Sequence, residues 1–189
     1  MINTVHKIFF VWQLEKEEAW LNDMASHGYS LTHASKFGTY DFEESQTDKY
    51  TYKILFLKGS FNSAENIKYL KFLEEMGISA VCHYGYPFTS CVYVRGLAED
   101  YPDGIDLFSD IDSKINYIKI MAFYLLFVLC LLIVATVLNF IAGVNTEYIN
   151  PLNVIEGSIT LGLGIATTIA MIKEFVQIGK LKKEREIHE

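Results

Sequence analysis

The residues most suited to metal chemistry lie close together near the middle of the chain. Cys82 and His83 are adjacent, and Cys91 follows after the turn at Tyr86-Pro87. Successive side chains of a strand point to opposite faces, so His83 faces away from Cys82, and a zinc site would still need a fourth ligand. The sequence therefore predicts no metal site. The two thiols could face each other across a hairpin, or they could be buried as small hydrophobic residues, as is usual in a reducing compartment.

Motifs of known enzyme classes are absent from the sequence. It has no nucleophile elbow, phosphate loop, dinucleotide fingerprint or zinc-binding helix motif. The residues best suited to catalysis are Asp41, Glu43, His33 and His83, and an active site would require them to lie together in one cleft. We therefore expect no enzymatic activity and no cofactor. The net charge of −7 argues against direct binding of nucleic acid.

Aromatic residues are frequent before residue 60, and large rings usually fill a core. The alternative is that some rings line a cleft or an uncovered sheet face, which would mark a surface for a partner or ligand. The candidates for that surface are Tyr40, Phe42, Tyr50 and Tyr52.

The spacing of apolar residues predicts two similar halves, each with the order strand, helix, strand, strand. The expected elements are a strand over 7–12, a helix over 15–27, strands over 29–35, 39–43 and 50–57, a helix over 64–76, and strands over 78–84 and 89–95. The strand over 7–12 is expected to be central because both of its faces are apolar. Both helices end at a glycine, Gly28 or Gly77. The similarity of the two halves fits either a duplication or two unrelated helices that end in the same way. The sequence thus predicts an α+β fold over 1–96, as a small ferredoxin-like two-layer sandwich or a pseudo-twofold pair of such units.

Two apolar stretches follow an acidic linker over 97–113, in which we expect a helix to begin. The first stretch, Ile120 to Thr146, has no charged residue and is long enough to span a membrane. The second, from Leu152 to Ile172, is interrupted by Glu156, and an amphipathic surface helix is the alternative. We expect a transmembrane hairpin within the region 114–189.

Small residues recur every four positions in the second stretch, at Ser158, Gly162, Ala166 and Ala170. Such a stripe allows two helices to approach closely. It could pack against the first span or against another chain, which would make a homo-oligomer.

Basic residues flank the two stretches on their outer sides and are missing from the connection between them. They are Lys114 and Lys119 before the first stretch, and Lys173, Lys180, Lys182, Lys183 and Arg185 after the second. The positive-inside rule then places both termini, the basic tail included, in the cytoplasm. The N-terminus lacks the features of a secretory signal, so we expect the first domain to remain on the side where it is made.

Four segments resemble an uncharacterised bacterial membrane family, known as domain of unknown function 2812. They are FFVWQLEKEEAWLNDMASHGYSLTHAS, KYTYKILF, FLEEMGISAVCHYGYPFTSCVYVRG and LFSDIDSKINYIK, within about residues 7–120. Relatives often carry Trp and Phe around the last hairpin, where this chain has Pro87, Thr89 and Cys91. The resemblance implies a small cytoplasmic domain before transmembrane helices. It also implies a regulatory or sensing role, because such genes often lie beside PadR-type transcription regulators.

These features predict a membrane-anchored, non-enzymatic regulatory or sensory protein. Its cytoplasmic domain would bind a protein partner, such as a transcription regulator or another membrane protein, and its hairpin would lie in the lipid bilayer. The alternative is a ligand-binding module for an apolar or amphipathic small molecule.

Overall fold

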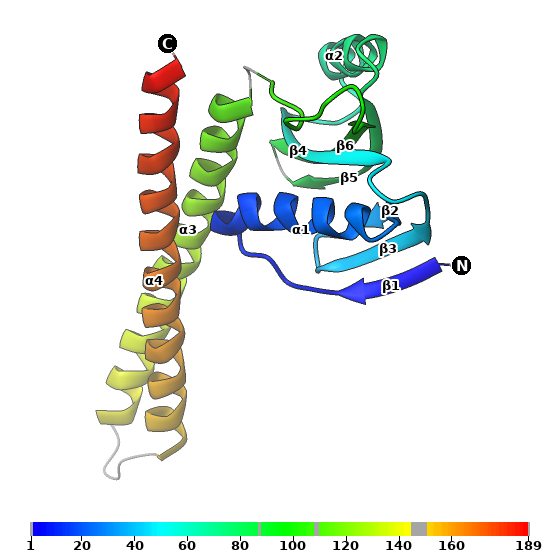
Figure 1. Cartoon of the computed structure of the whole chain (residues 1–189). Helices are drawn as coiled ribbons and strands as arrows, with labels where there is room; N and C mark the ends of the chain where they lie inside the picture. Colours follow the sequence, from blue (N-terminus) through cyan, green and yellow to red (C-terminus); the bar gives the residue numbers. More distant parts are fainter. Residues whose placement is uncertain (1, 87, 108–109, 145–150, 189) are drawn as a thin grey trace. The chain divides into compact units, whose positions relative to one another are not determined.

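A computed structural model describes residues 2–86, 88–107, 110–144 and 151–188 (Figure 1). The chain divides into two compact units, Met1–Tyr117 and Ile118–Glu189. Each is described by itself below.

The first unit contains two halves with the same topology. The first half comprises β1 (Ile2–His6), a 3-10 turn η1 (Val11–Gln13), α1 (Leu14–Ser26), β2 (Tyr29–Ala34) and β3 (Thr39–Glu44). The second half comprises β4 (Tyr50–Lys58), α2 (Ala64–Glu75), β5 (Ser79–Tyr86) and β6 (Thr89–Leu97). Each half forms its own antiparallel sheet, with strand orders β1-β3-β2 and β4-β6-β5. The predicted α+β fold is confirmed, and the shared strand order matches the paired arrangement.

Two glycines end the helices, as the sequence predicts. Gly28 follows α1 with φ of 83°, and Gly77 follows α2 with φ of 81°. This left-handed conformation closes the last helical turn and costs glycine little.

The prediction of a central strand over 7–12 is wrong. The first strand is β1, which ends at His6 and lies at the edge of its sheet, where His6 pairs with Thr39. Because β3 begins at Thr39, the chain beyond His6 runs past the end of its antiparallel partner. One more backbone bond forms, from the N–H of Lys7 to the carbonyl of Gly38 at 2.8 Å. The following apolar residues leave the sheet.

The β4-β6-β5 sheet is covered on both faces. One face packs against α2 and the segment after β6, forming a core of Leu55, Leu57, Leu73, Ile78, Val92, Val94 and Ile105. The other face turns toward α1 and the first sheet, where the hydroxyl of Tyr52 accepts the N–H of Leu31 at 2.9 Å. Figure 1 shows α1 running between the two sheets. The second sheet is therefore enclosed on both faces.

The second unit contains most of α3 (Asp110–Val144) and all of α4 (Pro151–His188). The stretches Ile111–Gly143 and Pro151–Lys183 are long and apolar enough to cross a membrane, with mean hydropathies of 2.9 and 1.6. The connection predicted around residues 143–151 lies mostly outside the described residues.

The contact between α3 and α4 uses a different face from the predicted one. The hydroxyl of Thr136 donates to that of Thr160 at 2.9 Å, and Gly157 is buried. By contrast, Ser158, Gly162 and Ala166 are exposed and Ala170 is half-buried, and a Cβ added at Gly162 would meet no atom within 4 Å. Packing of this stripe against the first span is therefore the wrong prediction, because the threonine pair and Gly157 set the contact face. A contact of the stripe with another chain stays a prediction.

Candidate functional site

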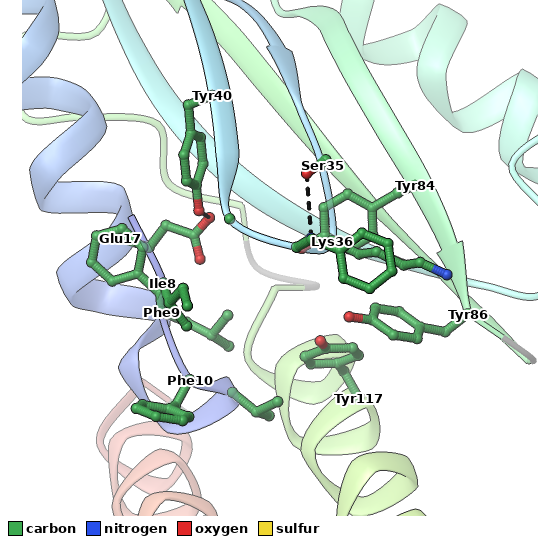
Figure 2. Close-up of a pocket in the computed structure, with 14 residues that line it drawn as sticks. Ile8, Phe9, Phe10, Glu17, Ser35, Lys36, Tyr40, Tyr84, Tyr86 and Tyr117 are labelled. Carbon is green, nitrogen blue, oxygen red and sulfur yellow. Dashed lines mark hydrogen bonds between the residues drawn. The ribbon is translucent and has the colours of Figure 1, made fainter. Parts of the chain in front are cut away.

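A cavity of about 280 Å³ opens in the first unit (Figure 2). Four parts of the chain form its wall. They are the segment before and at the start of α1 (Ile8, Phe9, Phe10, Val11 and Leu14) with Glu17, the β2–β3 turn (Ser35, Lys36, Phe37 and Gly38) with Tyr40 of β3, the β5 residues Tyr84 and Tyr86, and Tyr117 in α3. Half of the lining residues are aromatic, and Glu17 is the one acidic residue among them.

The carboxylate of Glu17 is held by two tyrosine hydroxyls. Tyr40 of β3 donates to Oε1 at 2.6 Å, and Tyr93 of β6 donates to the same oxygen at 2.5 Å. The side chain is only 5% exposed, and this burial raises the pKa of Glu17, while the two hydroxyl donors act in the opposite direction. Figure 2 shows the carboxylate reaching from α1 toward Tyr40 at the cavity wall.

The tyrosines around Glu17 continue the polar network. The hydroxyl of Tyr84 lies 3.4 Å from that of Tyr93. Burial raises the pKa values of Tyr40, Tyr84 and Tyr93 far above neutrality. These phenols therefore stay protonated and can donate hydrogen bonds. Tyr86 and Tyr117 turn their hydroxyls toward one another across the cavity, with ring centroids 6.0 Å apart (Figure 2).

The adjacent acid, Glu18, has a structural role instead. It accepts the backbone N–H of Ile54 at 3.1 Å and forms ion pairs with Lys114 at 3.3 Å and Lys53 at 3.5 Å. In the described part of the chain, no basic side chain lies within 4.0 Å of Glu17. Of two neighbouring carboxylates, one is neutralised by lysines and the other faces the cavity without a cation.

The mouth of the cavity is apolar. Ile8 is 74% exposed and Phe37 is 78% exposed, and both lie on the cavity wall. Phe9 lies deeper and packs on Trp20, with centroids 5.5 Å apart. Lys36 is also part of the wall, but Figure 2 shows its amino group pointing away from Glu17.

The structure separates the four aromatic candidates predicted from the sequence. Tyr40 lines the cavity with its hydroxyl on Glu17, whereas Phe42 and Tyr52 are buried in the core. The prediction of an exposed sheet surface is wrong for Tyr40, Phe42 and Tyr52. These side chains lie on the faces of the two sheets that α1 and the opposite sheet cover. Tyr50 is half-buried and stacks against the guanidinium of Arg95 at 4.2 Å.

The four candidate catalytic residues predicted from the sequence do not lie together in the cavity. His33 pairs with Asp41 across β2 and β3, and Asp41 accepts the hydroxyl proton of Thr4 at 2.7 Å. His83 stacks on Phe61 with centroids 3.7 Å apart, in the other sheet. Glu43 lies on β3 opposite Ser30.

The cysteines of the hairpin are not opposite one another. Cys91 pairs with Tyr84, and Cys82 pairs with Tyr93. Burial raises the pKa of Cys82 to about 12 and also raises that of Cys91, so both remain thiols.

Sequence reasoning missed Glu17, Tyr84, Tyr86, Tyr93 and Tyr117. A signal for Glu17 was present, because Leu14, Glu17 and Leu21 share one helical face, which places an acid among buried leucines. For the tyrosines there was no local signal, since they come together only through the fold.

Comparison with known proteins gives one match. A family model described as "Protein of unknown function (DUF2812)" matches residues 13–131. Neither the curated proteins nor the solved structures compared contain a match. The matched region includes α1, the strands β2 to β6, Glu17 with its two tyrosine donors, and most of α3, whereas β1 lies before it. Because it covers more than half of the chain, this protein belongs to the DUF2812 family.

Proposed function

We propose that this chain is a membrane-anchored sensory protein whose α+β unit binds a small apolar or amphipathic molecule. The observation that carries the proposal is the aromatic cavity with one buried carboxylate, Glu17, in its wall. Ligand pockets are typically apolar with a few placed polar groups that fix orientation. The wall described above has that composition.

The volume of the cavity limits the ligand. At about 280 Å³, it lies near the lower end of the range of about 300–1,000 Å³ that is usual for ligand sites. A single substituted aromatic ring or a short branched chain fits this volume better than a nucleotide or a lipid.

The membrane part of the proposal places both candidate spans across the bilayer with both termini in the cytoplasm. Its support is the apolar length of α3 and α4, together with basic residues on the outer flanks of both stretches. The ligand-binding unit would then sample the cytoplasm.

A regulatory role would require a protein partner, such as a transcription regulator or another membrane protein. The apolar side chains of Ile8 and Phe37 at the cavity mouth favour this second function, because exposed apolar residues often mark contact surfaces. A partner that contacts this rim would respond to occupancy of the cavity.

Binding of a neutral fluorinated probe, 4-fluorobenzyl alcohol, to the full chain in lipid nanodiscs tests the ligand-binding function. The probe is followed by fluorine NMR. Val11→Phe adds a ring inside the cavity wall and should abolish binding, whereas Ile67→Phe adds the same ring on the exposed side of α2 and should not. Both variants are measured in the same nanodiscs, so subtracting one probe signal from the other removes the contribution of probe that partitions into the lipid. Equal probe signals in the two variants would contradict the proposed function.

A further inference from the structure

We infer that the cavity takes a small organic cation, an ammonium group carried on an aromatic or branched alkyl body, with the positive charge against Glu17. This assignment rests on the proposed ligand-binding function and names its ligand class. It is carried by the placement of one carboxylate, by the rings around it and by the position of the one lysine among the lining residues.

The surroundings of the Glu17 carboxylate favour a positively charged partner from outside the chain. A buried charge is costly unless it is paired, and hydrogen bonds offset only part of that cost. Both tyrosine donors of Glu17 bind Oε1, and no basic side chain in the described ranges lies within 4.0 Å of the carboxylate. The neighbouring Glu18 shows the contrast, because it is paired with two lysines. A ligand ammonium would complete at Glu17 the pairing that Lys53 and Lys114 provide at Glu18.

The rings of the wall suit the same ligand. Phe9, Tyr40, Tyr84, Tyr86 and Tyr117 line the cavity. The faces of aromatic rings carry negative potential, and sets of such rings bind alkylammonium groups in other proteins. The phenols remain neutral, so they add ring faces and hydroxyl dipoles without adding charge.

An anionic ligand fits the wall less well. Lys36 is the one basic residue among those that line the cavity, and its amino group lies over the ring of Phe37 at 5.1 Å and points away from Glu17 (Figure 2). A phosphate or carboxylate in the cavity would face Glu17 with no cation between them. The charge distribution therefore favours a cation.

A matched pair of probes separates charge from shape. Benzyltrimethylammonium and benzyl alcohol are each titrated into the full chain in zwitterionic nanodiscs, with ligand-observed NMR as the readout. Wild type should bind the cation about tenfold or more tightly than the alcohol, as expected for a desolvated cation with ring and carboxylate contacts. Glu17→Gln keeps an oxygen acceptor for Tyr40 and Tyr93 and should lose this preference. Glu15→Gln removes the same charge from an exposed site on the same helix and should keep it.

The outcomes distinguish the two proposals. Equal affinity of wild type for both probes, or a cation preference that survives in Glu17→Gln, overturns the cation assignment and leaves the ligand-binding function intact. Failure of wild type to bind either probe contradicts the ligand-binding function itself. If Glu17→Gln does not fold, Val11→Phe replaces it: this variant keeps the carboxylate and fills the cavity, and cation binding that persists in it places the cation elsewhere and overturns the assignment.

Discussion

Glu17 and Glu18 are adjacent in the sequence but have different partners in the fold. A helix turns about 100° per residue, so neighbours face different surroundings. Glu18 meets β4 and two lysines, whereas Glu17 meets two tyrosines and the cavity. A close pair of acids thus provides one structural ion-pair centre and one carboxylate that is available to a ligand.

The raised pKa of Glu17 predicts how stability depends on pH in the absence of ligand. The folded chain holds this proton more tightly than the unfolded chain, so stability should fall as pH rises from 4.5 through the raised pKa of Glu17. Glu17→Gln should remove this decline. Both tryptophans, Trp12 and Trp20, lie in the first unit, so thermal melting followed by tryptophan emission reports on that unit alone.

Several titratable side chains of the same unit interact with Glu17, namely Glu18, Tyr40, Tyr86, Cys91, Tyr93 and Tyr117. All of them are present in wild type and in Glu17→Gln, so the comparison reports the change at residue 17. Parallel melting curves for wild type and Glu17→Gln across this pH range would show that burial of Glu17 does not disfavour its charged form.

Helix α1 connects the two halves of the first unit. Asn22 accepts the N–H of Tyr52 at 2.7 Å and donates to its carbonyl at 3.2 Å, which occupies the free edge of β4. Nearer the start of α1, Glu17 accepts hydrogen bonds from Tyr40 of β3 and Tyr93 of β6. A helix of the first half thus closes an edge of the second sheet, and this covers an otherwise open row of backbone groups.

Loss of the Asn22 side chain should destabilise the first unit. Asn22→Ala leaves two backbone groups of Tyr52 without partners, at an expected cost of about 1–3 kcal/mol. Asn62→Ala is the matched control, because Asn62 is exposed in the loop before α2. The same tryptophan melting experiment measures both variants. An Asn22→Ala chain that melts with wild type would show that α1 is held by other contacts.

Local patterns predicted much of the fold. The helices and the strands of the second half follow from apolar spacing and from Gly28 and Gly77, which act within a few residues. The end of β1 depends on where β3 begins, which is a long-range property that the apolar segment after His6 concealed. The cavity was not predictable for the same reason, since its wall joins four separate segments.

The whole chain combines a cavity-bearing unit with two helices that could cross a membrane, and its basic residues predict the orientation. A membrane-impermeant maleimide applied to intact cells should label Glu147→Cys, in the predicted outer connection, above the level of the unaltered chain. It should not label His188→Cys, in the predicted cytoplasmic tail. The reverse pattern would invert the proposed topology, and labelling at both sites would indicate a single span.

The central claim is that a small molecule enters the cavity beside Glu17 in the membrane-anchored chain. Probe binding in nanodiscs by wild type, Val11→Phe and Ile67→Phe tests it most directly. The proposal predicts saturable binding to wild type and Ile67→Phe and none to Val11→Phe. Saturable binding that persists in a folded Val11→Phe chain, or the absence of binding to wild type of both the neutral probe and the cationic probe, would contradict the claim.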